Sequence, residues 1–147
     1  MQKHLCILVV CGLLIGADEA QKSDQRKGDL DQMQGTWRAV AMESKGKAKG
    51  ADEVKKFQLI VNKDEFAVKL DGADHVSGKL VLRPNKKPKE VDLVQETGPV
   101  YKGIYEIDGQ RLKMCVCISS DADSQRPKDL TTNEDSENVF MTWERTP

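Results

Sequence analysis

Apolar and polar residues alternate in Ile107-Asp-Gly-Gln-Arg-Leu-Lys-Met-Cys-Val-Cys-Ile118. Every second residue from Leu112 to Ile118 is a large apolar one, and this period of two is typical of a β-strand with two different faces. Asp108-Gly109 precedes the run, and Asp-Gly between two strands is a strong signal for a tight hairpin turn. The segment therefore predicts an antiparallel hairpin with strands at 100–107 and 110–118.

The same alternation recurs along the rest of the chain, with turn-forming residues between the runs. It predicts further strands at 36–43, 57–62, 65–70, 75–82, 90–95 and 138–145. Only one other segment of the later chain, 52–56, looks helical, and it is short. Eight antiparallel strands joined by tight turns predict an all-β fold. The expected form is an eight-stranded antiparallel up-and-down barrel, because closure removes free sheet edges. A two-sheet β-sandwich is the alternative.

The composition excludes several classes of protein. The 147 residues are 38% hydrophobic and 32% charged, which is too apolar for a disordered tail and too polar for a membrane protein. Lys plus Arg total 23 and Asp plus Glu total 24, so no basic excess indicates a nucleic-acid partner. The run 83–89 carries four positive charges. Two interpretations are open: a contact site for an anionic surface or polysaccharide, and a solvated loop. The run contains no aromatic residues for base stacking.

The N-terminal residues differ in composition from the rest of the chain. A lysine at position 3 precedes an apolar run at 5–16, which is too short to span a bilayer as a helix but fits a secretory signal peptide. Ala17 is the expected cleavage site and Ala20 is a second candidate. A buried N-terminal strand or helix is the alternative, whereas a lipoprotein signal would place its Cys after the run. We expect an exported protein, in the periplasm or outside the cell, without a membrane span after cleavage.

These features divide the chain into a signal peptide at 1–17, a flexible polar leader at 18–29 and a barrel domain at 30–147. The leader is polar and shows no apolar period. Residues 29–34 would form a short helical turn that places Leu30 and Met33 on one side.

Signal cleavage would leave two of the four cysteines, Cys115 and Cys117. On a strand, residues two apart share a face with Cα atoms about 6.6 Å apart, so a disulfide between them would need local distortion. A zinc site needs four ligands, and the mature chain offers only His75 besides these thiols. We therefore predict buried or half-buried free thiols, with a link between two chains as the alternative.

Gly35-Thr-Trp37 at the start of the first strand resembles the Gly-x-Trp signature of lipocalins and other calycins. The resemblance implies that Trp37 closes one end of an eight-stranded barrel, with Gly35 beside it. It also implies that a basic residue near the last strand stacks on the Trp ring, and Arg145 would fill that role by a cation–π contact.

A longer resemblance covers most of the mature chain. Leu30-Asp-Gln-Met-Gln-Gly-Thr-Trp37 resembles the LxxLQGTW opening of a conserved domain common in planctomycete bacteria. Further segments at 85–93, 102–109, 112–115 and 126–127 resemble that domain in the same order. The resemblance implies an exported, lipocalin-like protein of a family of unknown function. The sequence departs from the pattern at Cys117, where a small residue is more usual.

No catalytic constellation stands out, so we predict no catalytic residues, no cofactor and no metal. Asp71, Asp74 and His75 are metal-ligand types, but a polar hairpin turn explains them better. A Gly-x-Ser-x-Gly elbow and a phosphate-binding glycine loop are both missing from the sequence. A cysteine in the middle of a strand lacks the His or helix N-terminus that would activate it.

Tyr101 and Tyr105 are four apart on one predicted strand and share a face. They either line a ligand cavity with their polar tips or cap the core. We therefore expect a non-catalytic domain that binds a small apolar or amphipathic ligand in the barrel, with the two tyrosines as ligand-binding residues. The alternative is a structural or protein-interaction module of the cell envelope with a filled core. The sequence does not identify a protein partner.

Overall fold

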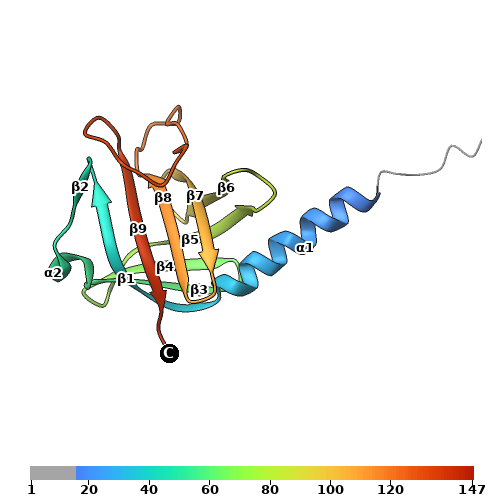
Figure 1. Ribbon diagram of the computed structural model, residues 1–147, viewed down its shortest axis with the longest axis horizontal. Helices are drawn as coiled ribbons and strands as arrows, with labels where there is room; N and C mark the ends of the chain where they lie inside the picture. Colours follow the sequence, from blue (N-terminus) through green and yellow to red (C-terminus); the bar gives the residue numbers. More distant parts are fainter. Residues whose placement is uncertain (1–15) are drawn as a thin grey trace, which may run out of the picture.

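A computed structural model of the protein describes residues 16–147 (Figure 1). The predicted signal peptide at 1–17 lies almost entirely outside the described residues, as do Cys6 and Cys11.

Eight antiparallel strands close into a barrel, and a ninth, two-residue strand pairs only with the end of the first. The strands are β1 (Gly35–Ser44), β2 (Lys47–Ala48), β3 (Phe57–Asn62), β4 (Glu65–Leu70), β5 (Ala73–Arg83), β6 (Lys89–Gln95), β7 (Val100–Asp108), β8 (Arg111–Cys117) and β9 (Asn138–Arg145). The predicted eight-stranded barrel is confirmed, with strand ends shifted by a few residues. The sandwich alternative is wrong, because β1 pairs with both β3 and β9 and leaves no open edge between two sheets.

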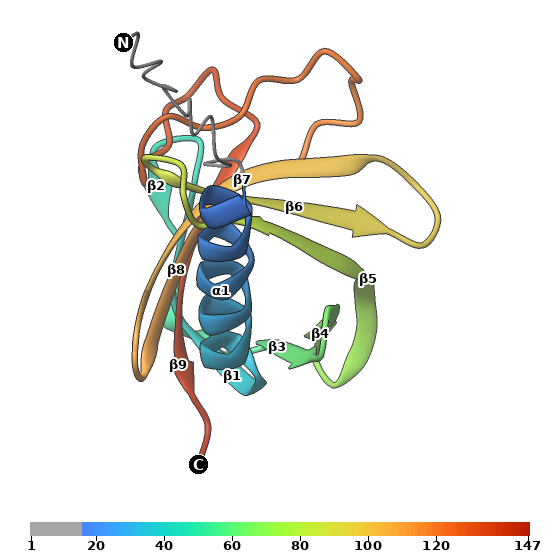
Figure 2. The same ribbon diagram turned by 90° about the vertical axis from the view of Figure 1, so that its right-hand side faces the viewer.

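The pairing of β1 with β9 closes the barrel. It runs from Trp37 opposite Arg145 to Ser44 opposite Val139, and its register shifts between Ala39 and Ala41. Figure 2 shows that β5 bends sharply on the opposite side of the barrel. At Gly78, β5 comes so close to β6 that a Cβ atom there would lie 2.0 Å from the carbonyl oxygen of Val94. Only a residue without a side chain fits this approach.

The structure contains a long helix, α1 (Gly16–Met33), where we predicted a flexible polar leader at 18–29. This prediction is wrong about local structure, because helix formation there does not need an apolar face. Asp18 and Glu19 lie in the first turn, where negative charge favours a helix. Lys22 also pairs with Asp18 one turn away, at 2.9 Å. Residues 18–28 are exposed, so no hydrophobic period marks this part of the helix in the sequence.

The last turn of α1 fits the prediction for 29–34. Met33 is fully buried and Leu30 packs against the core. Figure 1 shows the rest of α1 projecting away from the barrel. The second helix, α2 (Ala51–Val54), covers most of the short segment predicted at 52–56, and its Val54 is buried. Within residues 16–147, neither helix is long and apolar enough to cross a membrane.

A second, smaller buried layer lies outside the barrel wall. Ile104 on β7 and Cys115 and Cys117 on β8 are buried, although they alternate with residues that face the interior. The connection between β8 and β9, residues 118–137, covers them: the Cys115 thiol lies 3.5 Å from the carbonyl oxygen of Thr131. One face of β7 and β8 therefore meets the core and the other meets this loop.

Candidate functional site

One end of the barrel is closed by Trp37 and Arg145, as the resemblance to the Gly-x-Trp signature implied. Trp37 is fully buried, and the Arg145 guanidinium carbon lies 4.2 Å from the centre of the Trp37 ring. The Trp37 indole N–H donates to the Met33 carbonyl at 2.8 Å, and Arg145 donates to the carbonyl oxygens of Gln32 and Gln34. These carbonyls end α1, where the helix dipole favours a positive charge. The pair therefore closes the barrel and caps the helix.

Gly35 lies beside this pair with φ of +109°, a conformation that residues with a Cβ rarely adopt. A Cβ atom at this position would also lie 3.3 Å from an Arg145 nitrogen. This geometry agrees with the structural role beside Trp37 that the Gly-x-Trp resemblance implies for Gly35.

Tyr105 belongs to the closed end and does not line the cavity described below. Its side chain is buried, and its hydroxyl donates to the Asp29 carboxylate of α1 at 2.6 Å. Lys89 pairs with the same oxygen at 2.8 Å. Burial raises the pKa of Tyr105 well above its usual range, and the adjacent Asp29 carboxylate raises it further. Tyr105 is part of the core cluster, which agrees with the alternative that it caps the core, and its role as a ligand-binding residue stays a prediction.

The other half of the barrel interior contains an apolar cavity of about 230 Å³. Residues from β1 and from β3 to β9, with Ile118 just beyond β8, line it: Met42, Phe57, Leu59, Phe66, Val68, His75, Val76, Leu93, Tyr101, Met114, Val116, Ile118, Val139, Met141 and Trp143. Tyr101, the other tyrosine predicted to bind a ligand, is among them. Tyr101 and Tyr105 thus share a face of β7, but Tyr101 lies toward the open end of the barrel and Tyr105 toward the closed end.

The cavity opens at the end away from Trp37. Phe57, His75 and Tyr101 lie near the first residues of β3, β5 and β7, strands that run from this end toward the closed end. His75 is exposed, and its ring meets the edge of Phe57 with 6.4 Å between ring centres. Ile118, 48% exposed, also lies at this opening. The opening is therefore apolar, with one imidazole at its rim.

Few polar atoms face this space. Its lining contains no Asp, Glu, Lys or Arg among the residues that the structure describes. Among the lining residues, only His75, Tyr101 and Trp143 carry a side-chain nitrogen or oxygen atom. Trp143 is only 3% exposed, and its indole nitrogen is buried without a hydrogen-bond partner.

The structure does not support a metal site at Asp71, Asp74 and His75. Asp71 faces Lys56 at 3.5 Å and Asp74 faces Lys69 at 3.6 Å. Within the described part of the chain, no three His, Cys, Asp or Glu side chains lie close enough together to hold a metal ion.

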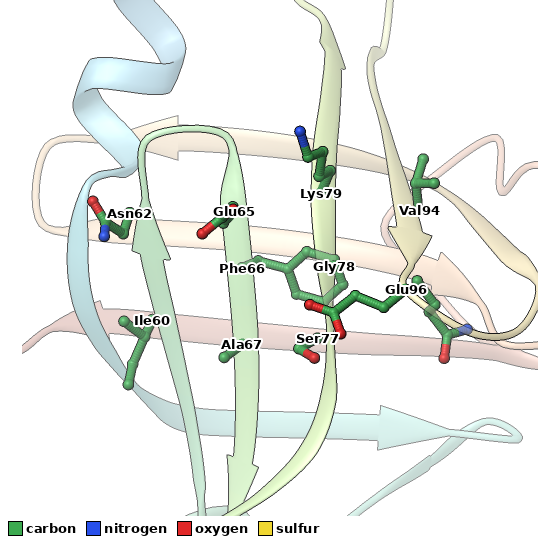
Figure 3. Close-up of a pocket in the computed structure, with 11 residues that line it drawn as sticks. Ile60, Asn62, Glu65, Phe66, Ala67, Ser77, Gly78, Lys79, Val94 and Glu96 are labelled. Atoms are coloured by element: carbon green, nitrogen blue, oxygen red, sulfur yellow. The ribbon is translucent and has the colours of Figure 1, made fainter.

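A second hollow, of about 390 Å³, lies on the outer side of β3 to β6 where β5 bends. Figure 3 shows the ring of Phe66 between β4 and β5 beside Gly78, and the Glu96 side chain extending over β5 toward Ser77. This hollow is open to solvent and bordered by charged side chains, so it offers less enclosure than the interior cavity.

The thiols on β8 carry no bond to each other, as predicted. Burial raises the pKa of Cys115 to about 11, with a smaller effect from the carboxylates of Asp129 and Glu43. A thiol with this pKa is protonated at neutral pH and is a poor nucleophile or metal ligand.

An arginine of the β8–β9 connection fastens that loop to the wall. Arg126 donates to the carbonyl oxygens of Val91 and Gly103 and pairs with Asp92 at 2.7 Å. Arg83 pairs with the other Asp92 oxygen at 2.7 Å. Burial alone would raise the pKa of Asp92, but the two arginines outweigh it and lower the pKa below its usual value. The thiols and this ion-pair cluster therefore hold the β8–β9 connection against the barrel wall, and they do not line the cavity.

None of the protein-family models, curated proteins or solved structures compared with the chain matches it. The resemblance to the planctomycete-type domain therefore stays a prediction from the sequence, and the cavity must be interpreted from its own geometry.

Sequence reasoning missed most of the cavity wall. The alternation placed Met114, Val116, Met141 and Trp143 on inward-facing positions, but it did not separate those that fill the core from those that border empty space. Trp143 shows the problem, because nothing in the sequence indicates that its indole N–H lacks a partner.

Proposed function

We propose that the protein is an exported, non-catalytic binding domain that holds a small apolar or amphipathic ligand inside the barrel. The observation that carries the proposal is the apolar cavity of about 230 Å³ with its opening at the end away from Trp37. An eight-stranded barrel is wide enough either to be filled by side chains or to hold one small ligand, and this barrel has space left.

The volume suits a small molecule. Apolar cavities of roughly 150 Å³ bind benzene, and drug-sized ligands occupy pockets of about 300–1,000 Å³. A ligand of one ring with a short chain, or a short acyl chain, falls between these limits.

The chemistry of the wall favours binding over catalysis. His75 and Tyr101 line the cavity, but the lining includes no carboxylate, serine, lysine or cysteine within the described chain. The imidazole therefore has no nucleophile to activate and no carboxylate to orient it among the lining residues. The alternative, a structural or protein-interaction module with a filled core, has less support because it leaves the cavity without a role.

Calorimetric titration with propylbenzene tests the proposal with two variants of β5. Val76→Phe places a ring in the cavity, whereas Val81→Phe adds the same ring at a position that is 39% exposed on the outer side. We expect wild type and Val81→Phe to bind alike and Val76→Phe to bind at least tenfold more weakly, because the phenyl group takes the space of the ligand. Absence of binding to the wild type, or equal binding by both variants, would overturn the proposal.

Export is proposed from the short apolar run behind the lysine at position 3. The planctomycete-type resemblance, which implies an exported family, supports it. N-terminal sequencing of the mature protein from its host should start at Asp18 or Gln21, in material from the periplasm or the medium. Cytoplasmic protein that retains Met1 would contradict this proposal and leave the binding proposal intact.

A further inference from the structure

We infer that His75 recognises the head group of an amphiphilic ligand, with a carboxylate at the rim of the cavity against the imidazole and an apolar tail inside the barrel. The inference rests on the proposed binding function and deepens it, because it names the class of ligand and the way in which the ligand is oriented.

A β-bulge brings His75 to the cavity. On β4, Val68 and Lys69 are consecutive. Their partners on β5 are Val76 and Asp74, which leaves His75 unpaired between them. Consecutive residues of a regular strand point to opposite faces, yet His75 and Val76 both line the cavity. Bulges re-aim side chains in this way and are common next to active sites. The irregularity of β5 therefore adds an imidazole to the cavity wall.

The imidazole is accessible at this position. His75 is exposed, and its ring meets the edge of Phe57, another lining residue, with 6.4 Å between ring centres. An imidazole carries at least one N–H donor in either protonation state. His75 can therefore donate a hydrogen bond to a group that lies at the opening of the cavity.

The carboxylates near His75 face other side chains. Asp71 lies 3.5 Å from Lys56, and Asp74 lies 3.6 Å from Lys69. Each of these carboxylates therefore has a lysine as its countercharge, which leaves the imidazole to pair with an acceptor that arrives with the ligand.

The interior determines where a charged head group can lie. No Asp, Glu, Lys or Arg lines the cavity among the described residues, and burying a charge without a partner is costly. A charged head must therefore stay at the rim, in contact with water, while the tail occupies the cavity. A carboxylate there accepts a charge-assisted hydrogen bond from an imidazolium, which is stronger than a neutral one. An ammonium head has no acceptor for an imidazole N–H.

Three probes with the same phenyl ring and three-carbon chain separate these head groups. They are 3-phenylpropanoate, 3-phenylpropan-1-ol and 3-phenylpropylammonium. We expect the wild type to bind the carboxylate about fivefold more tightly than the alcohol, and the ammonium more weakly than the alcohol. A fivefold ratio corresponds to about 1 kcal/mol, which is the size of one typical hydrogen bond.

The decisive quantity is the affinity of the carboxylate divided by that of the alcohol, measured by calorimetry for wild type and two variants. His75→Phe keeps an aromatic ring beside Phe57 but removes the N–H donors, so we expect the ratio to fall about fivefold. Lys47→Gln removes a positive charge from β2, an exposed strand that pairs with the open end of β1 and does not line the cavity. This control should change the ratio by less than twofold, because exposed charges are screened by salt.

A second measurement uses the wild-type protein. The chain contains two histidines, His4 and His75, and the imidazole signals of His75 in ¹⁵N-histidine-labelled protein are identified by their loss in His75→Phe. At saturation with probe, these signals should move further with 3-phenylpropanoate than with 3-phenylpropan-1-ol.

The outcomes separate the two proposals. If neither propylbenzene nor any of the three probes binds the wild type, both proposals fail. If propylbenzene binds but the carboxylate-to-alcohol ratio is one or less, or is unchanged in His75→Phe, the binding function stands and the inference about His75 is wrong. An equal fall of the ratio in Lys47→Gln would also overturn the inference, because it would indicate a diffuse effect of charge. Imidazole signals that respond alike to both probes would contradict the contact with the carboxylate.

Discussion

The two ends of the barrel share the same eight strands but differ in how their interior is used. At the closed end, Met33, Trp37 and Leu112 are fully buried, and Tyr105 donates to the buried Asp29 carboxylate. At the open end, Phe57 and Tyr101 are half-buried around a cavity. The last turn of α1 helps to fill one end, whereas the other end keeps a cavity although large side chains line it.

This difference shows that the number and pairing of the strands do not by themselves determine whether side chains fill the barrel interior. The closed end is filled from outside the sheet, because α1 contributes Met33 and Leu30 to the core and Asp29 to a partly buried ion pair. The open end receives no such contribution from α1 among the described residues. We therefore expect the free energy of folding to depend most on the closed end, and binding to depend on the open end.

The largest effect is expected from Trp37→Ala. Removing a large buried aromatic side chain costs about 3–5 kcal/mol, and a domain's total stability is typically about 5–15 kcal/mol. Urea unfolding should show this loss, whereas Phe57→Ala at the open end should cost clearly less because Phe57 is only half-buried. Equal losses of unfolding free energy in the two variants would contradict the expectation that the closed end contributes more to stability than the open end.

The contact between Trp37 and Arg145 can be isolated by a double-mutant cycle. Arg145→Ala alone should cost on the order of 0.5–2 kcal/mol for the cation–π pair, plus its bonds to the end of α1. Because the two side chains touch, the losses of the single variants should not add in the double variant. Strict additivity would contradict the contact.

The two tyrosines of β7 give the next largest contrast. Tyr105→Phe removes a buried hydrogen bond to a carboxylate, and such bonds contribute about 1.5–3 kcal/mol. Tyr101→Phe removes a hydroxyl at the open end and should change the free energy of unfolding by less than about 0.5 kcal/mol. Each variant loses one hydroxyl oxygen from the same strand. An equal loss of unfolding free energy in both would therefore show that the hydrogen bond from Tyr105 to Asp29 adds no measurable stability.

High pH should weaken the closed end through Tyr105. Its pKa in the folded protein lies above the unfolded value of about 10. The unfolded chain therefore loses this proton first, and the stabilisation is complete below about pH 10 and is lost as the pH rises further. Urea unfolding at pH 8 and pH 11 should show a larger loss in wild type and Tyr101→Phe than in Tyr105→Phe. The Cys115 thiol also titrates in this range, but it affects all three proteins alike, so identical losses in all three would rule out Tyr105 as the cause.

The smallest effect is expected from His75→Ala. The imidazole is exposed at the rim, and exposed substitutions usually change stability by less than about 0.5 kcal/mol. Thermal unfolding should give a midpoint close to that of the wild type. A loss as large as that of Tyr105→Phe would mean that the rim helps to hold the barrel together.

The sequence predicted the barrel because its wall obeys a simple period. Alternation along 110–118 and the Asp108-Gly109 turn predict β7 and β8 within a residue or two. The closed end at Gly35 and Trp37 was implied by the resemblance to the Gly-x-Trp signature. Helix α1 escaped prediction because its exposed turns bury nothing, so no apolar period exists to detect. The cavity and the placement of Tyr105 depend on depth along the barrel axis, which follows from strand tilt and from α1 and not from the alternation itself.

The pairing of β1 with β9 has a consequence for how the chain reaches its native state. Arg38 and Glu144, joined across this seam at 2.9 Å, are 106 residues apart in the sequence. Contacts between distant residues slow folding, and this seam cannot form until β9 has left the ribosome. Until then β1 and β8 present unpaired edges, which are prone to pair with other chains. Pairing of β9 with β1 and β8 therefore completes the barrel, and a nascent chain that stops short of Asn138 leaves these two strand edges unpaired.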